Sequence, residues 1–425
     1  MRLLRSSLPV ILCLSSIICT HVNALSSLAS SSASIQYAPL PTAEADRAFR
    51  YASSLEKAGL TRTAHAAYHE AATLYQCFLD STDFDHVTDV DQTSDVKRFM
   101  LYSCMKLAFF SNDALSDPKA ALRLYREAAS MEVQSAEAFD GIGTSIEACV
   151  GNLEEAVAAY RVAFDLRNES DSPSGTIAFH LGVALERLGM EEEAEVLMDR
   201  LRRSEASYAC LVDSWGYVRW HTRRKDSKQL NLYMGTRNML QLGIESAMDL
   251  VKEADGLVCE FGVASGRSTR MLQELLPLDC MLNGFDTFTG LPLPWQDLPA
   301  GSFSTDGAIP NIEGEVKFYS GLFRDTIPEF LRKIEKTETE EKFRPLAFAN
   351  IDVLMYGSTL DILESMHSRV VPGTIITFGD YMCHSSWRQD EFRAWRECCK
   401  RFGWSYEYIG FSLATKQVIV RVTSA

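Results

Sequence analysis

The sequence predicts two domains: an all-α helical-repeat solenoid and, after it, an open, doubly wound α/β domain. The chain has 425 residues, more than one hydrophobic core usually organises, since single cores stop growing near ~250 residues. A pattern of small residues recurs in the N-terminal half, whereas in the C-terminal half a strand pattern runs into a glycine-rich turn and a helix. We place the solenoid in residues 41–220 and the α/β domain in residues 230–425.

Residues 1–24 are predicted to be a secretory leader rather than part of either domain. The first residues carry two arginines, Leu8–Ile18 is apolar, and the small residues of Val22–Ala24 form a cleavage site. The apolar run is shorter than the ~20 residues that span a bilayer, which disfavours a membrane anchor. The Ser-rich residues 25–40 are expected to be a flexible linker. The leader predicts a secreted or lumenal protein, or one that reaches a plastid through the same membranes.

Composition and charge restrict the class of partner. The formal net charge is −15, which argues against a nucleic-acid partner, because phosphate binding needs clustered Lys and Arg. No apolar run after the leader is long enough to span a membrane, so we expect a soluble mature chain. Removal of Cys13 and Cys19 with the leader leaves nine of the eleven cysteines. This odd count, without close spacings, disfavours a disulfide framework and a zinc site.

The solenoid is predicted from four segments in which a turn residue is followed by an alanine and then by a large side chain. The alanines are 57, 35 and 38 positions apart. This is close to the ~34-residue period of helix-turn-helix repeats once an insertion at residues 80–95 is allowed. The four segments are Gly59, Ala64 and Tyr68; Ser116, Ala121 and Tyr125; Gly151, Ala156 and Tyr160; and Gly189, Ala194 and Met198.

The third and fourth segments resemble tetratricopeptide repeats. Stacked repeats of this kind bury their faces only against each other. Two roles follow for them: a concave surface for a protein or peptide partner, or a helical cap that orients or dimerises the second domain. We expect the solenoid to end near Trp220, with the polar residues 221–229 as a junction.

The α/β domain begins with a strand, a glycine-rich turn and a helix. The strand is expected at Leu257–Phe261 and the helix at Arg267–Leu275, with Gly262 and Gly266 in the turn between them. Glycines at this point let the backbone approach a ligand, and ligands of open α/β sheets bind at the carboxyl ends of the strands. The pattern therefore predicts a nucleotide-type pocket.

An acidic residue after the second strand predicts what this pocket binds. Asp286 follows the strand pattern 281–285, about twenty residues beyond the turn, where a carboxylate accepts hydrogen bonds from the ribose of an adenosine. The Gly-x-Gly-x-x-Gly of dinucleotide sites is absent, and Glu260 before the turn suits the cationic S-adenosylmethionine. The predicted residues of this cofactor site are Glu260, Gly262, Ala264, Ser265, Gly266, Ser268, Asp286 and Thr287.

Five segments, in order and spacing, resemble the macrocin O-methyltransferase family. The resemblance covers about 180 residues and implies a seven-stranded, Rossmann-like class I methyltransferase fold. It also implies S-adenosylmethionine as methyl donor and an alcohol on a sugar or natural product as acceptor. The segments are Glu260–Ser268, Phe285–Pro292, Gly321–Pro328, Ile351–Thr359 and Pro372–Tyr381.

The resemblance also implies a metal site, because many members bind the acceptor oxygens through Mg²⁺. Members usually carry two acids after the fourth strand and two after the fifth. This chain keeps Asp352 and Asp380, but Leu354 and Gly379 stand where the other two acids are expected. Mg²⁺ prefers several oxygen ligands. Asp352 and Asp380 are thus an incomplete metal set, which either holds a metal with water and substrate or acts without one.

Methyl transfer also needs a base for the acceptor proton. Asp352, after the fourth strand, is the first candidate for this base, and His384 is the second. Three aromatic residues are candidate walls of an acceptor pocket, and residues 295–309, rich in Gly, Pro and Ser, are expected to form a mobile lid. The aromatic residues are Trp295, Tyr356 and Trp387.

The function predicted from the sequence is S-adenosylmethionine-dependent O-methylation of a hydroxylated small molecule or glycan, with the repeats as an interaction module. One alternative is a binding protein that keeps the cofactor pocket but has lost catalysis, because two family acids are missing. Another is a protein methyltransferase whose repeats present the substrate. The intact donor motifs favour an enzyme.

Overall fold

The computed structural model describes most of the chain after the N-terminal region. The described residues are 43–57, 61–81, 90–113, 117–131, 135–149, 151–168, 175–204, 208–223, 231–232, 235–336 and 343–425. The predicted leader and linker, and most of the predicted junction, lie outside these residues. Within the described ranges, none of the helices combines the length and the apolar character that a membrane span requires.

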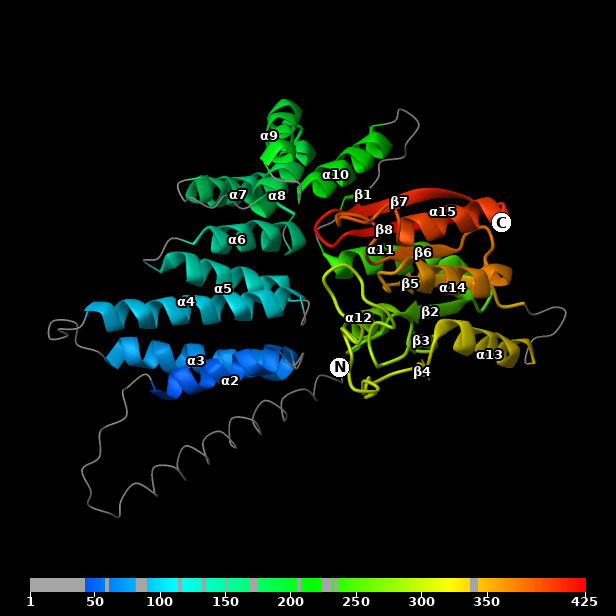
Figure 1. Ribbon diagram of the computed structural model, residues 1–425, viewed down its shortest axis with the longest axis horizontal. Helices are drawn as coiled ribbons and strands as arrows, with labels where there is room; N and C mark the ends of the chain where they lie inside the picture. Colours follow the sequence, from blue (N-terminus) through cyan, green and yellow to red (C-terminus); the bar gives the residue numbers. More distant parts are fainter. Residues whose placement is uncertain are drawn as a thin grey trace, which may run out of the picture.

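The N-terminal half is a stack of antiparallel helix pairs (Figure 1). Consecutive helices contact each other along the whole stack, as in a solenoid. This confirms the all-α repeat architecture. The helices are α2 (Ala43–Lys57), α3 (Thr61–Ser81), α4 (Val90–Asp113), α5 (Pro118–Ser130), α6 (Ala136–Cys149), α7 (Leu153–Asn168), α8 (Gly175–Arg187), α9 (Glu191–Ser204) and α10 (Ala209–Thr222).

The four repeated alanines lie in the second helix of each pair, in α3, α5, α7 and α9, and all are fully buried. Small residues in the first helices receive the large side chains that follow those alanines. A Cβ atom on Gly143 of α6 would lie 2.5 Å from the ring of Tyr160 in α7. On Gly182 of α8 it would lie 2.6 Å from Met198 in α9. In the third and fourth repeats, the sequence period therefore corresponds to close packing of the paired helices.

The C-terminal half is a single eight-stranded sheet in the order β1-β7-β8-β6-β5-β2-β3-β4. All neighbouring strands are parallel except β8, which runs antiparallel to β6 and β7. Without β1, this is the seven-stranded order of class I methyltransferases, as expected. The strands are β1 (Asn231–Leu232), β2 (Leu257–Phe261), β3 (Leu282–Asp286), β4 (Val316–Ser320), β5 (Leu346–Ile351), β6 (Ile375–Phe378), β7 (Ser405–Ser412) and β8 (Gln417–Ser424).

Helices cover both faces of this sheet (Figure 1). On one face α11 (Thr236–Glu253) packs against β5 to β8 and against α12 (Arg267–Leu275). The other face is covered by α13 (Phe323–Glu335), α14 (Tyr356–Met366) and α15 (Glu391–Phe402), which contact one another in that order. This doubly wound arrangement leaves the carboxyl ends of the parallel strands open for a ligand.

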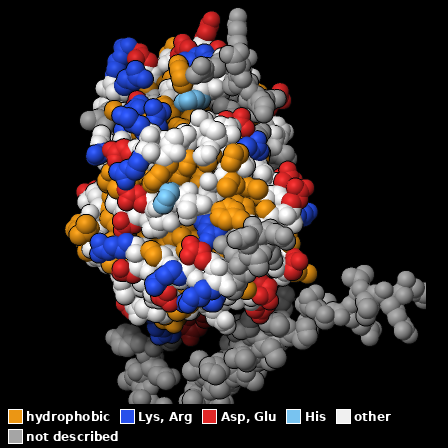
Figure 2. Space-filling model, turned by 90° about the vertical axis from the view of Figure 1, so that its right-hand side faces the viewer, with side chains coloured by type: hydrophobic (Ala, Val, Ile, Leu, Met, Phe, Trp, Pro, Cys, Tyr) orange, Lys and Arg blue, Asp and Glu red, His pale blue; other side chains and the backbone are white. Residues whose placement is uncertain are grey.

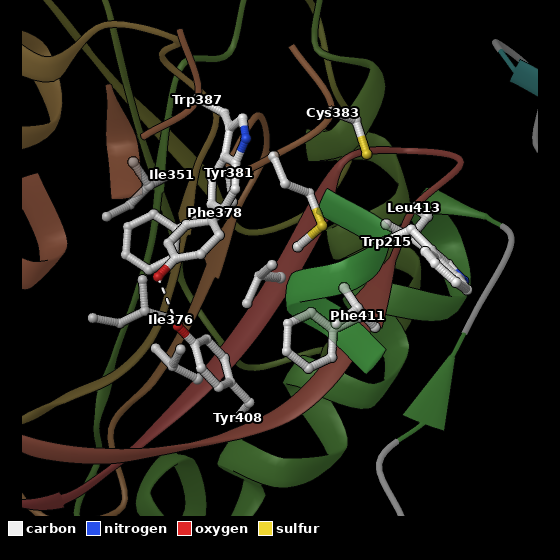
Figure 3. Close-up of a cluster of buried hydrophobic side chains, with 14 of the residues drawn as sticks. Trp215, Ile351, Ile376, Phe378, Tyr381, Cys383, Trp387, Tyr408, Phe411 and Leu413 are labelled. Atoms are coloured by element: carbon white, nitrogen blue, oxygen red, sulfur yellow. Dashed lines mark hydrogen bonds between the residues drawn. The ribbon is translucent and has the colours of Figure 1, made fainter. Parts of the chain in front are cut away.

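The last repeat helix, α10, packs against the α/β half of the molecule. Ser214 Oγ accepts a hydrogen bond from the backbone N–H of Cys383 at 2.9 Å, and the Tyr217 and Tyr408 hydroxyls lie 2.6 Å apart. Trp215 belongs to the same buried cluster as Phe411 and other side chains of the sheet (Figure 3). The two halves thus share a continuous apolar interface.

The described surface carries charges of both signs, and most of the described thiols are buried. On the face in Figure 2, acidic and basic side chains are interspersed rather than separated into areas of one sign. Eight cysteines of the described ranges are free, and Cys104, Cys259, Cys383, Cys398 and Cys399 among them are buried. Buried free cysteine behaves as a small hydrophobic residue.

Candidate functional site

A cavity of about 1350 Å³ opens at the carboxyl ends of the strands. Its lining joins the glycine-rich turn after β2, the ends of β3, β5 and β6, the β7–β8 turn, the segment after β3, and Phe109 of α4 in the repeats. Six of the eight predicted donor residues line it. They are Gly262, Ala264, Ser265, Ser268, Asp286 and Thr287.

The turn after β2 is shaped by two glycines with positive φ. Gly262 has φ +89°, and a Cβ on it would overlap the backbone oxygen of Asp352 at the end of β5. Gly266 has φ +78° and precedes α12, where a Cβ would lie 2.8 Å from Ile312. Residues that carry a side chain rarely adopt this backbone conformation. Gly262 therefore lets two strand ends approach closely, whereas Gly266 shapes the helix start without lining the cavity.

Asp286 holds this turn in place in addition to facing the cavity. Its Oδ2 accepts hydrogen bonds from the backbone N–H groups of Val263 and Ala264 at 2.7 and 2.8 Å. Its Oδ1 accepts one from Phe288 N–H at 2.7 Å. A carboxylate has about four lone-pair positions, so it can accept a ribose hydroxyl as well. The residue expected to bind the ribose thus also fixes the backbone around it.

Glu260 does not face the cavity, which corrects its assignment as a direct donor contact. Its side chain is fully buried, and it accepts hydrogen bonds from Thr269 Oγ1 at 2.5 Å and Asn350 Nδ2 at 3.3 Å. Burial raises its pKa to about 7, against hydrogen bonds from Ser268, Thr269 and Asn350 that lower it. Glu260 therefore supports the turn from beneath by joining β2 to α12 and β5.

The two retained acids lie next to each other at the carboxyl ends of the neighbouring strands β5 and β6. Asp352 follows β5 and Asp380 follows β6, and both line the cavity. Asp352 lies deep in the domain, but its side chain is exposed to the cavity. Burial, followed by repulsion from Asp380, raises the pKa of Asp352 to about 7, while Arg267 and Lys416 oppose the rise. A carboxylate of this pKa is suited to accept a proton near neutral pH.

The acids present do not fit a divalent metal. No group of three or more His, Cys, Asp or Glu side chains suitable for a metal occurs within the described residues. A Cβ on Gly379, where the family carries an acid, would overlap the Asp352 carboxyl group. Leu354, at the other missing acid, brings an apolar side chain to the cavity lining. Hard cations need several oxygen ligands, and this edge offers two carboxylates.

His384 is not positioned to act as the second base. It is 6% exposed and does not line the cavity. Its Nδ1 accepts a hydrogen bond from Gln296 Nε2 at 2.9 Å, and its Nε2 donates one to the Asp380 backbone oxygen at 2.9 Å. Burial lowers its pKa. Both ring nitrogens are thus engaged within the protein, and the geometry does not support His384 as a base.

The expected lid covers the cavity and is tied to the loop that carries His384. Ser302 and Phe303 line the cavity. Trp295 Nε1 donates a hydrogen bond to Asp390 Oδ2 at 3.2 Å, close to the Gln296–His384 contact. The lid's mobility stays a prediction.

The three aromatic candidates for an acceptor wall are not part of the cavity lining. Tyr356 bonds to Glu397 on α15, Trp387 bonds to Asp213 of α10, and Trp295 bonds to Asp390. Their roles are to connect secondary-structure elements. The lining instead contains residues that sequence patterns did not identify, Phe109 and Lys416.

The sheet order, the glycine-rich turn and the acid after β3 together define a class I methyltransferase domain. Residues 309–401 match the family model described as Macrocin-O-methyltransferase (TylF). The match spans three of the five ordered segments, Gly321–Pro328, Ile351–Thr359 and Pro372–Tyr381, and confirms the resemblance to this family. No curated protein matches the chain.

Solved structures of methyltransferases and of tetratricopeptide-containing proteins are distantly similar to the chain. The calicheamicin methyltransferase CalS11 is 18% identical, with a TM-score of 0.34, and the match covers 55% of this chain and 92% of that one. The O-methyltransferase NovP is 20% identical, with a TM-score of 0.33 and coverages of 45% and 81%. The C-terminal tetratricopeptide-containing domain of a Plasmodium falciparum putative FK506-binding protein is 16% identical, with a TM-score of 0.29 and coverages of 36% and 93%.

Proposed function

We propose that this protein is an S-adenosylmethionine-dependent O-methyltransferase that acts on a hydroxylated small molecule or glycan. The observation that carries the proposal is one cavity that connects the Gly262–Ser265 turn and Asp286 with Asp352. The Gly262–Ser265 turn and Asp286 can bind an adenosine with a charged tail. Asp352 can accept the proton of an acceptor hydroxyl. Proximity of two bound reactants supplies a large part of the rate of such a transfer.

The donor pocket fits S-adenosylmethionine by the chemistry of its lining. Asp286 offers a carboxylate for ribose hydroxyls, and the Gly262 turn admits backbone approach. When bound, the donor supplies a methyl group activated by a sulfonium. Glu260 and Thr269 keep the turn and the start of α12 in register beneath that position.

Asp352 serves as the base of the proposed reaction. The acceptor oxygen forms a bond to the methyl carbon as the carbon–sulfur bond breaks, and the hydroxyl proton passes to Asp352. The products are a methyl ether and S-adenosylhomocysteine. Because the pKa of Asp352 is about 7, the group is partly ionised at neutral pH and can accept the proton.

The repeats are proposed to hold and border the catalytic site, which favours the role of a helical cap over that of a separate partner-binding module. The contacts of α10 with Cys383 and Tyr408 support this proposal. Phe109 of α4, in the cavity lining, supports it from a second place in the stack. A protein partner on the remaining repeat surface is compatible with the same arrangement.

The proposed activity is tested with the purified full chain, radiolabelled S-adenosylmethionine and fractionated extracts. Transfer of label to a small molecule or glycan, with and without EDTA, is the expected result. Donor binding without transfer to any fraction would favour a binding protein, and label found only on polypeptides would favour protein methylation.

We also propose that residues 1–24 direct the chain into the secretory pathway. A fluorescent fusion of the full chain should enter that pathway, and a fusion that lacks residues 1–24 should remain in the cytosol. Identical distributions of the two fusions would reject the proposal.

A further inference from the structure

We propose that Lys416 supplies, from within the chain, the positive charge that a divalent metal supplies beside the acceptor in related methyltransferases. The inference rests on the proposed function, because it concerns the acceptor side of the same cavity. It assigns to Lys416 the neutralisation of the acid pair and the binding of an acceptor oxygen.

The topology brings Lys416 to the acid pair from the far end of the chain. Because β8 runs antiparallel, the turn before it lies at the same sheet edge as the carboxyl ends of β5 and β6. Lys416 is the last residue of that turn. Its Nζ lies 3.3 Å from Asp380 Oδ1, and Lys416 lines the cavity together with Asp352.

The position of Lys416 is fixed by its backbone rather than left to a flexible loop. Its carbonyl oxygen accepts a hydrogen bond from the backbone N–H of Tyr381 at 3.1 Å, directly after Asp380. The Thr415 hydroxyl bonds to Ser412 Oγ and Gln417 Oε1, each at 2.7 Å, which closes the turn. The backbone from which the Lys416 ammonium reaches Asp380 is therefore fixed.

Two basic side chains of the protein oppose the acid pair. Asp352 and Asp380 are opposed by Lys416 and Arg267, both of which line the cavity and act on Asp352. The third carboxyl group nearby, Glu391, accepts hydrogen bonds from the backbone N–H groups of Val353 and Asp380. Burial raises the pKa of Glu391 well above its usual range, while these two backbone hydrogen bonds oppose the rise.

Two features of the neighbouring residues agree with a cation supplied by the protein. The absence of a side chain on Gly379 makes room for the Asp352 carboxyl group, which a Cβ at that position would overlap. Leu354 replaces a potential oxygen ligand by an apolar side chain. Both changes remove potential metal ligands, while Lys416 places a positive charge beside Asp380.

An ammonium can do part of the work of a metal at this place. It carries three N–H donors, and Asp380 uses one of them, so donors remain for an acceptor oxygen. A positive charge next to that oxygen favours its deprotonated form, as a metal does. Unlike a metal, a lysine side chain is not removed by a chelator.

The test measures Mn²⁺ binding by electron paramagnetic resonance on the full chain, without donor or acceptor. Its outcome is therefore independent of whether the protein transfers methyl groups. The variants are Lys416→Met, which keeps the length but removes the charge, and Lys416→Arg, which keeps the charge. The double variant Lys416→Met with Asp380→Asn removes both partners of the ion pair. The matched control is Lys400→Met, at an exposed position of α15. Circular dichroism and thermal unfolding establish that each variant is folded.

We expect the wild type, Lys416→Arg and Lys400→Met to show no stoichiometric Mn²⁺ site. Lys416→Met removes the cation that pairs with Asp380, so its Mn²⁺ affinity should rise by more than about tenfold, and the double variant should lose this gain. Stoichiometric Mn²⁺ binding by the wild type that Asp380→Asn abolishes would overturn the inference. A folded Lys416→Met variant that binds Mn²⁺ no better than the wild type would overturn it as well.

Discussion

The hydroxyl groups of Tyr217 and Tyr408 lie 2.6 Å apart although 191 positions separate the two residues in the chain. Tyr217 belongs to the last helix of the repeats and Tyr408 to a strand of the catalytic sheet. Tyr408 also bonds to the buried Tyr381 at 2.9 Å, next to Asp380 (Figure 3). The stability of the active-site edge is thus coupled to the repeat domain.

Replacement of Tyr217 by alanine should destabilise both halves together. The ring of Tyr217 contacts Trp387, Phe392 and Tyr408. Its loss removes buried apolar contact and should lower the free energy of unfolding by about 3 kcal/mol. Urea unfolding followed by circular dichroism measures the change. Val196→Ala, at a 71% exposed position of α9, is the control and should have no comparable effect. An unchanged midpoint for Tyr217→Ala would show that the interface does not contribute to stability.

Two glycine-to-alanine substitutions in helices should have opposite signs. At Gly143 a methyl group meets the fully buried Tyr160 ring at 2.5 Å, so overpacking should cost about 1–3 kcal/mol. At Gly216 of α10 nothing lies within 4 Å of the added Cβ, so alanine should stabilise by about 0.4–1 kcal/mol through helix propensity. Thermal unfolding of both variants measures the difference. Equal shifts would contradict the packing of the repeats described above.

Asp286→Asn should weaken binding of S-adenosylhomocysteine by about 1–3 kcal/mol. The amide keeps the shape but loses the negative charge, and it supplies only one oxygen to the backbone N–H groups of Val263, Ala264 and Phe288. Titration calorimetry on the full chain measures the affinity. Asp249→Asn, on the exposed side of α11, serves as the control. Equal affinities for wild type and Asp286→Asn would remove this residue from the donor site.

Glu260→Gln should change how stability depends on pH. The pKa of Glu260 is raised from its ordinary value of 4.5 to about 7 in the folded protein. Between these pH values the unfolded chain loses a proton that the folded protein keeps, so wild-type stability falls as pH rises. The variant cannot ionise at this position, so its stability should not fall in this way. As pH rises from 4.5 to 7, the free energy of unfolding of the variant should therefore increase by up to about 3 kcal/mol relative to that of the wild type. Urea unfolding at several pH values measures this gain. A constant difference across the series, as expected for Glu245→Gln on α11, would contradict the prediction.

Asp352→Asn should reduce methyl transfer by ~10²–10⁴-fold while S-adenosylhomocysteine still binds. Because the pKa of Asp352 is about 7, the wild-type rate should rise with pH up to about 7 and then level off. The rate is measured as transfer of labelled methyl to the active extract fraction. Asp325→Asn, an exposed acid in the first turn of α13, should leave the rate unchanged. A wild-type profile that is flat between pH 5 and 8 would reject Asp352 as the base.

The sequence predicted those features that depend on local patterns. The alanines at 64, 121, 156 and 194 marked the second helix of each repeat, and the strand, turn and helix around Gly262 occur as expected. Glu260 and Asp286 were both placed near the donor. Only the structure shows that Glu260 is buried beneath the turn, because alternate residues of a strand end on opposite sides of a sheet.

The features that sequence patterns missed depend on contacts between distant segments. Lys416 has no local motif, and its place beside Asp380 follows from the antiparallel direction of β8. Similarly, α10 has no local signal of its partner, because its contacts with Cys383 and Tyr408 join residues 169 and 191 positions apart. His384 lies next to the acids in sequence, yet its ring is enclosed by Gln296 and the Asp380 backbone.

The docking of α10 has a consequence for where the protein can be divided. The chain leaves α10 at Thr222 and returns to the sheet at Asn231 in β1, which pairs with β7, the strand that carries Tyr408. The two segments on either side of this connection, α10 and β1, are thus both attached to the same part of the catalytic domain. We expect a nick between them to leave two fragments that stay associated through the α10 contacts. On the same expectation, two independent pieces require a division before α10, inside the repeats, rather than at the polar stretch that divides the two patterns in sequence.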